Sequence, residues 1–157
     1  IPGVTNGRVI EGPVSNVDIV PTLLDIMGQP VPGGLDGKSL YPVIKGEARL
    51  EDNDVFIEWN GINGEEEWCN GCPDSELQRR ATEVLGAKVR TIISADGWRL
   101  SLSEAGENEL YNLAEDPFET KNLYFDERYR DVVGRLNGKI SEWQKKTGDT
   151  ANVVKCC

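Results

Sequence analysis

Apolar residues recur at helical spacing near the end of the chain, and this is its clearest pattern. Between residues 126 and 146 they fall at Tyr129, Val132, Val133, Leu136, Ile140 and Trp143. Side chains three or four positions apart share one face of an α-helix, so the spacing predicts a long amphipathic helix of about four turns. Lys145 and Lys146 suit the negative end of this helix, and Gly148 is expected to end it.

Runs of β-branched and aromatic residues predict strands in the middle of the chain. They cover residues 54–59, 89–94 and 98–103, and Glu109 to Leu113 adds a fourth, shorter run. The second and third runs are joined through Asp96-Gly97, a dipeptide typical of hairpin turns. Residues 74–85 have helical composition, and we expect that helix to end at Gly86. These elements predict a small antiparallel sheet with the long helix on one face, an α+β unit.

The first part of the chain has a different pattern. Residues 15–28 predict a short helix, capped by Ser15 or Asp18 and ended by Gly28. Its apolar positions surround most of the helix, so we expect burial on more than one side. A helical turn over 39–44 follows, closed by Gly46. A charged, apolar-poor stretch at 47–53 predicts a boundary between residues 1–46 and a unit formed by 47–157.

The charge balance limits the classes of molecule that the chain is expected to bind. The 157 residues hold 17 Lys and Arg against 27 Asp and Glu, a net charge of −10. Such a surface repels polyanions, so we expect no nucleic acid to bind. A membrane span needs about 20 consecutive apolar residues, and the sequence contains no such run. We therefore expect a soluble chain, but the sequence is compatible with both cytoplasmic and periplasmic or secreted locations.

The residues that usually carry hydrolytic chemistry are scarce. Histidine is absent, which removes the commonest general base and the commonest zinc ligand. The four cysteines form two pairs, Cys69 with Cys72 and Cys156 with Cys157. A four-thiolate zinc site is one interpretation, although the adjacent pair is geometrically awkward for it. Ordinary thiols, or disulfides in an oxidising compartment, are the other interpretation.

Several motifs, taken in order, resemble one known family. They are Val17 to Gly28, Leu35 to Leu40 with Gly46, Val89 to Thr91, Glu109 to Leu113, and Asp116 to Leu123. As a set they resemble the closing part of the sulfatases, within the alkaline-phosphatase superfamily. The resemblance implies that residues 1–46 are the last strand and helix segment of an α/β alkaline-phosphatase-like catalytic domain. Residues 47–157 would then be the C-terminal subdomain.

The resemblance also implies what this segment lacks. The family uses a formylglycine made from Cys or Ser in a Cys/Ser-x-Pro/Ala-x-Arg setting, and a calcium ion held by oxygen ligands. Here Cys69 is followed at the second position by Gly71, and Pro73 comes one position too early after Cys72. We therefore expect no catalytic residue, no metal ligand and no cofactor in this chain. Formylglycine and calcium are expected in an N-terminal catalytic half, which would be this chain's main partner.

Two residues are candidates for contact with a sulfated substrate. In similar sulfatases, loops of the C-terminal subdomain line one wall of the substrate cleft. Trp59 and Asn60 lie at the end of a predicted strand, where an aromatic ring can stack on a sugar and an amide can hydrogen-bond to its hydroxyls. A tryptophan in the core is the structural alternative. Arg90 lies within a predicted strand, which favours a structural ion pair over a substrate contact.

The function predicted from the sequence is a non-catalytic C-terminal part of a sulfuric ester hydrolase that acts on sulfated carbohydrate or aryl sulfate. A related phosphodiesterase or phosphonate hydrolase is the first alternative, because those enzymes share the architecture. A free-standing binding or structural module is the second. The apolar helix at 17–27 argues against a free module, because its surface would stay bare or force dimerisation.

Overall fold

The chain folds into two compact units. A computed structural model describes residues 1, 4, 7, 9–50, 52–62 and 75–153. The first unit comprises Ile1–Val55 with Ser94–Gly97, and the second comprises Phe56–Ile93 with Trp98–Cys157. Cys69, Cys72, Cys156 and Cys157 lie outside the described residues. The assignment of residues 1–46 to a catalytic domain stays a prediction.

The first unit is built on helix α1 (Ile19–Ile26), which follows a 3-10 turn at Asn16–Asp18. The sequence predicts Ser15 or Asp18 as the cap, and the structure uses both: each side chain accepts a backbone hydrogen bond in a capping box on this turn. The segment 37–40 then runs along α1: the Lys38 amide donates to Asp18 Oδ1 over 2.9 Å, and the Leu40 amide donates to Thr22 Oγ1 over 2.9 Å. The predicted turn is helix α2 (Tyr41–Lys45), which ends at Gly46 in the left-handed region.

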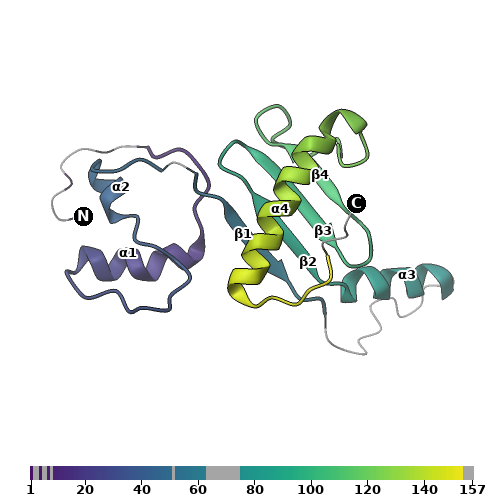
Figure 1. The fold of residues 1–157 in the computed structure, drawn as a ribbon, viewed down its shortest axis with the longest axis horizontal. Coiled ribbons are helices and arrows are strands. Elements are labelled where there is room, and N and C mark those ends of the chain that lie inside the picture. The colour runs from purple at the N-terminus through teal and green to yellow at the C-terminus, as the bar shows by residue number, and fades with distance from the viewer. Residues whose placement is uncertain (2–3, 5–6, 8, 51, 63–74, 154–157) are drawn as a thin grey trace. The chain divides into compact units, whose positions relative to one another are not determined.

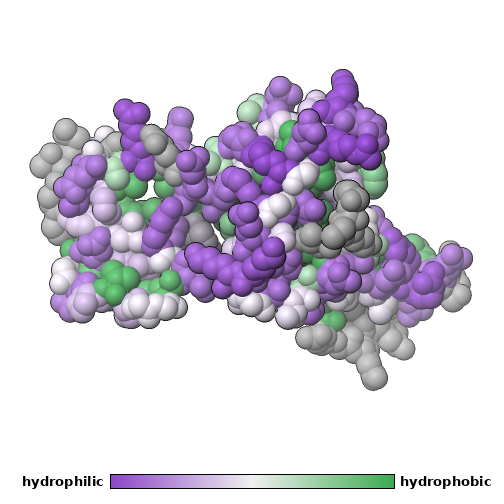
Figure 2. Space-filling view, viewed as in Figure 1, coloured by the Kyte–Doolittle hydropathy of each residue, from purple (hydrophilic) through white to green (hydrophobic). Residues whose placement is uncertain are grey.

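The apolar surface of α1 departs from the expectation. Ile19, Val20 and Leu23 are 53%, 54% and 51% exposed, and Val17 and Met27 are exposed to a similar degree. Green apolar atoms gather over α1 in the space-filling view (Figure 2). The predicted burial on more than one side is therefore wrong for this chain by itself: among the described residues, the 3-10 turn, α2 and the segment 37–40 pack on the helix and leave these side chains exposed.

The second unit contains a four-stranded sheet in the order β1-β2-β3-β4. The strands are β1 (Val55–Trp59), β2 (Val89–Ile93), β3 (Trp98–Ser103) and β4 (Glu109–Asn112). Strands β2, β3 and β4 pair antiparallel, with Ile92 opposite Leu100 and Leu100 opposite Leu110. Helix α3 (Ser75–Gly86) precedes β2. Helix α4 (Arg130–Thr147) lies across one face of the sheet (Figure 1), which confirms the predicted α+β architecture.

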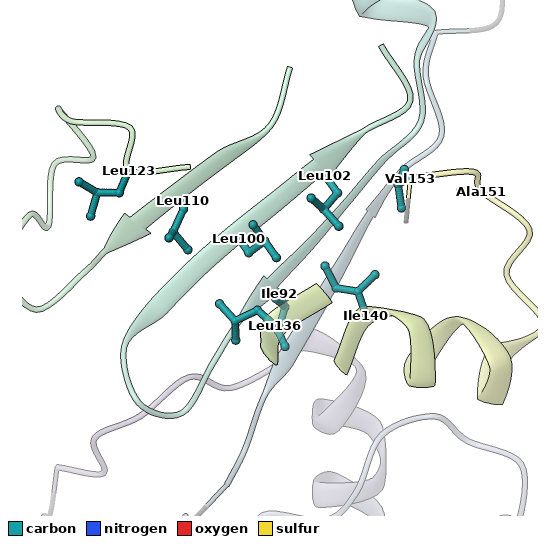
Figure 3. Packing of buried hydrophobic residues seen from close by; sticks show 9 residues of the cluster. All are labelled: Ile92, Leu100, Leu102, Leu110, Leu123, Leu136, Ile140, Ala151 and Val153. Atoms are coloured by element: carbon teal, nitrogen blue, oxygen red, sulfur yellow. The ribbon is translucent and has the colours of Figure 1, made fainter. Parts of the chain in front are cut away.

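The core lies between α4 and the sheet. Leu136 and Ile140 of α4 and Ile92, Leu100 and Leu110 of the sheet are fully buried. Figure 3 shows these side chains together with Leu102, Leu123, Ala151 and Val153, which complete the cluster. Period-2 alternation along the strands and period-3.6 spacing along α4 bring the apolar faces together, so the pattern in the sequence determines this core.

Side-chain hydrogen bonds and an ion pair fix the loop between β4 and the last helix. Asn122 Oδ1 accepts hydrogen bonds from the amides of Leu110 and Tyr124 over 3.1 and 2.9 Å. The Asp116 carboxylate accepts a hydrogen bond from the Lys121 amide over 2.9 Å. Glu119 forms an ion pair with Arg99 of β3, which ties the same loop to the sheet.

Two glycines inside α4 provide a stability test. Gly134 and Gly138 are exposed, and a Cβ at either position meets nothing within 4 Å. We expect Gly134→Ala and Gly138→Ala each to raise the free energy of unfolding by roughly 0.5 to 1 kcal/mol, because alanine loses less backbone entropy in a helix. Urea titration followed by circular dichroism measures this.

Gly148 is the matched control for these glycines. It ends α4 with φ +73°, and no neighbour lies within 4 Å of an added Cβ there either. Gly148→Ala should therefore lower stability, by about 1 kcal/mol, because alanine disfavours the left-handed conformation. A loss of stability in the α4 variants as large as in this control would contradict the prediction.

Candidate functional site

The candidate site lies at the end of β1, where the sequence predicts Trp59 and Asn60 as substrate contacts. Phe56 of β1 stacks on Trp143 of α4, with ring centroids 5.3 Å apart and planes 6° apart. Side chains alternate along a strand, so Ile57 and Trp59 lie on the face of the sheet away from α4. Both are nearly half exposed, at 48% and 47%. The Trp59 side chain is thus partly open to solvent and not in the core.

Arg90 of β2 connects to this strand end from the α4 face of the sheet. The residue is only 2% exposed. Its Nη1 donates to the carbonyl oxygens of Trp59 and Val89, each over 2.9 Å, and its Nη2 donates to Asn60 Oδ1 over 2.8 Å. The side-chain oxygen of Asn60, predicted to read substrate hydroxyls, is therefore engaged by a buried guanidinium.

Asp149 neutralises Arg90 from the segment after α4. The two side chains form a bidentate pair: Nε donates to Oδ2 over 2.9 Å and Nη2 donates to Oδ1 over 2.6 Å. These hydrogen bonds hold the pKa of the Asp149 carboxyl well below its usual range, although burial opposes the shift. Gln144 of α4 supports the pair, because its Nε2 donates to Asp149 Oδ2 over 2.7 Å and to the Ala151 carbonyl over 2.8 Å.

We refer to Trp59, Asn60, Arg90, Gln144 and Asp149 as the Arg90 cluster. The sequence predicts Arg90 as a structural ion pair, and the structure confirms this. The partner could not be identified from the sequence, because Asp149 lies 59 positions away in a part of the chain without a recognisable motif. The sequence did indicate that a partner must exist, because a lone arginine inside an apolar strand is a buried charge that requires one.

The Arg90 cluster provides structure and not acid–base chemistry. The Nε and both Nη atoms of Arg90 already donate to protein oxygens, which leaves the guanidinium little capacity to bind a sulfate. Within residues 9–50, 52–62 and 75–153, no three His, Cys, Asp or Glu side chains are grouped to hold a metal ion. In the same described part, no helix combines the length and apolar character that crossing a bilayer requires.

Gly61 makes the turn after the cluster possible. It has φ +74°, and a Cβ there would lie 2.1 Å from the carbonyl oxygen of Gly86 at the end of α3. The neighbouring Ile62 amide donates to the Leu85 carbonyl over 3.0 Å. We expect Gly61→Ala to lower the free energy of unfolding by more than about 2 kcal/mol, since the backbone must move in addition to adopting a disfavoured conformation.

Gly106 is the control for Gly61. Its φ is +85°, but an added Cβ meets nothing within 4 Å. Gly106→Ala should cost about 1 kcal/mol, which is the conformational part alone. Urea titrations of both variants measure the difference, and equal losses would show that the close approach of Gly61 to Gly86 has no effect on stability.

Comparison with known proteins identifies the relatives of this chain. No family model matches it. Arylsulfatase K of Danio rerio is 33% identical over 98% of the chain, and N-acetylglucosamine-6-sulfatase of Bos taurus is 27% identical over 95%. The chain matches a C-terminal portion of the sulfatases. It spans only about 30% of the length of these curated relatives.

Solved structures agree with the sulfatase-like fold. A putative sulfatase from Bacteroides thetaiotaomicron superposes with a TM-score of 0.64 over 84% of the chain and 25% of its own. A phosphonate monoester hydrolase from Silicibacter pomeroyi superposes with a TM-score of 0.68 over 99% of the chain and 29% of its own. Both are 24% identical to this chain, so they establish the fold and not the activity.

Proposed function

We propose that this chain is the non-catalytic C-terminal part of a sulfuric ester hydrolase. Its role is to complete the enzyme's fold and to provide, through Trp59, one wall of the cleft that binds the sulfated substrate. The similarity to sulfatases over nearly the whole chain supports this role. The names of the relatives favour a sulfated carbohydrate or an aryl sulfate as the substrate class. Histidine is absent from the chain, which favours a catalytic centre elsewhere in the enzyme.

The observation that carries the proposal is the apolar surface of α1. Ile19, Val20 and Leu23 together expose a contiguous apolar stripe on one short helix. Stripes of this kind on soluble proteins mark surfaces that another structure covers. The relatives are roughly three times as long as this chain, and their additional length supplies a body large enough to cover it. The proposed partner of α1 is therefore the preceding catalytic domain.

The cofactors belong to that partner in this proposal. Sulfatases use formylglycine and a calcium ion, and calcium requires six to eight oxygen ligands. The described carboxylates of this chain are not grouped for such a site. Neither Cys69 nor Cys72 stands in the sequence setting that formylglycine formation needs. Both groups are thus proposed for the N-terminal part, and this chain's residues would only shape the cleft beside them.

The test compares the natural gene product with the 157-residue chain. Intact mass gives the length of the natural product, and hydrolysis of an aryl sulfate with calcium present gives its activity. We expect a longer, active natural product and an inactive 157-residue chain. Faster hydrolysis of a phosphonate monoester than of the sulfate would favour the phosphonate hydrolase alternative, for which the structural likeness is equally good.

A variant of α1 tests the proposed partner surface. Leu23→Asp in the natural product should reduce soluble yield and activity together, because a carboxylate would be buried against the catalytic domain. Phe118→Ser is the matched control, since Phe118 is an apolar residue that is 87% exposed in the other unit. A natural product that consists of this chain alone would refute the proposal, and its zinc content would then test the cysteine site of a free-standing module.

A further inference from the structure

We propose that the Arg90–Asp149 pair is a positioning element that fixes the end of β1, and with it the Trp59 ring, for contact with the sugar of the substrate. The inference rests on the proposed function, because the position of Trp59 affects catalysis only if this chain lines the substrate cleft. Arg90 and Asp149 themselves would not touch the substrate.

Arg90 holds the end of β1. It contacts the two residues at which β1 ends, the main-chain carbonyl of Trp59 and the side-chain oxygen of Asn60. A strand end continues into a turn and loses the support of ladder hydrogen bonds. The planar guanidinium replaces that support with donors in a rigid geometry. The main chain that carries the Trp59 ring is therefore held from the side opposite to the ring.

Asp149 anchors Arg90 to the end of helix α4. Asp149 follows Gly148, where α4 ends, and its amide donates to the Gln144 carbonyl over 3.0 Å. The Gln144 side chain then binds the Asp149 carboxylate from the last turn of α4. Since α4 packs on the core through Leu136 and Ile140, the carboxylate is attached to an element that the buried cluster holds in place. The Arg90 cluster thus connects Trp59, the proposed wall of the substrate cleft, to the core.

The effect of the ion pair on the position of β1 is distinct from its effect on stability. A buried ion pair is often no better for stability than apolar side chains of the same volume. Ile92, two positions along the same strand and face, shows that apolar packing is accommodated there. What an apolar residue cannot supply is a set of donors aimed at both Trp59 and Asn60. The geometry therefore points to order at the strand end as the effect of the pair.

Arg99 offers a matched control. It is also a strand arginine, partly buried, and paired with the carboxylates of Glu119 and Glu109. The register places Arg99 opposite Ile93 and Arg90 opposite Leu102, so the two arginines lie on different faces of the sheet. Arg99→Lys removes the same fork from the same sheet, but the described polar contacts of Arg99 are with Ser101, Glu109 and Glu119 and not with the end of β1. A general effect of losing an arginine fork would therefore occur in both variants.

The first measurement is hydrogen exchange on the 157-residue chain, with Arg90→Lys and Arg99→Lys compared with the unchanged chain. We expect Arg90→Lys to speed exchange on the order of tenfold in peptides covering residues 57–62, with little change over 98–103. Arg99→Lys should leave 57–62 unchanged. If Arg90→Lys does not fold, Asp149→Asn is the second variant, because it keeps the shape and weakens the pair. Unchanged exchange at 57–62, or equally faster exchange throughout the unit, would overturn the inference.

The second measurement is steady-state kinetics of the natural gene product with a sulfated glucosamine and with a small aryl sulfate. We expect Arg90→Lys to raise KM for the sugar several-fold with little change in kcat, and to leave KM for the aryl sulfate unchanged. In a Trp59→Ala background the same change should add no further rise, because the two residues act as a unit. An equal effect on both substrates, or a full additional effect without Trp59, would overturn the positioning role.

Failure of the proposed function is distinguishable from failure of this inference. A natural product that hydrolyses no sulfate ester refutes the proposed function, whatever the exchange data show. Exchange that accelerates only at 57–62 in such a protein would still establish that Arg90 orders the end of β1, and would refute only its link to a sugar. Loss of sugar selectivity without a change in exchange would refute the positioning role alone.

Discussion

Replacing Asp149 with alanine is expected to lower the free energy of unfolding by about 3 to 5 kcal/mol, the largest single effect expected in this chain. The change leaves the guanidinium of Arg90, whose side chain is 3% exposed, without its bidentate partner. Glu58 Oε2 lies 3.9 Å from Nη2, but this half-exposed carboxylate is too distant and too screened by solvent to replace Asp149, so most of the desolvation cost of the buried charge is left without an offsetting attraction. Urea titration followed by tryptophan fluorescence measures the loss.

A double variant separates the pair from its parts. Arg90→Met with Asp149→Leu removes both charges, so it should be more stable than Asp149→Ala alone even though it contains two substitutions. A double variant that is less stable than Asp149→Ala would show that removing both charges costs more stability than leaving the Arg90 charge without Asp149. That result would contradict the account of Asp149→Ala as an unpaired-charge effect.

The pH dependence follows from the direction of the Asp149 shift. The folded-state pKa is lowered, so the contribution is fully present above the unfolded-state pKa of about 3.9 and is lost as the pH falls through the folded-state value. The stability difference between the unchanged chain and Asp149→Ala should therefore be constant from about pH 5 to pH 8 and should shrink only in stronger acid. A difference that declines already between pH 8 and about pH 5 would contradict the lowered pKa.

Leu136→Ala is expected to lower the free energy of unfolding by about 3 kcal/mol. Leu136 is fully buried at the centre of the cluster between α4 and the sheet. Truncation removes apolar contact and leaves a cavity that the strands, held in register on either side, close only partly. Urea titration followed by circular dichroism is the measurement, and the slope of the transition should stay unchanged.

Glu142→Ala is the matched control in the same helix. Glu142 is exposed, so its replacement should change stability by less than about 0.5 kcal/mol. This control separates the effect of the cavity from any effect of alanine on α4 itself. Equal losses in the two variants would mean that packing of α4 on the sheet does not stabilise the second unit.

Local pattern was sufficient to predict most of the secondary structure. The described helices and strands begin and end within a few residues of the predicted bounds, because side-chain period and glycine stops act over neighbouring residues. The antiparallel sheet, its covering helix and the likeness to the sulfatases followed from the same patterns and motifs. The end of β1 was predicted as a candidate site because Trp59 and Asn60 stand where a predicted strand ends.

Contacts between residues far apart in the sequence could not be predicted from local pattern. Arg90 required some buried partner, but only the packing of α4 on the sheet brought Asp149 to it, and only that pairing showed that Asn60 is engaged. The closeness of Gly61 to Gly86 likewise depends on how β1 and α3 end. The sequence by itself determined the elements and their apolar faces, because these depend on near neighbours. The tertiary structure decided which polar groups meet and which apolar face stays bare, because both depend on segments far apart in the chain.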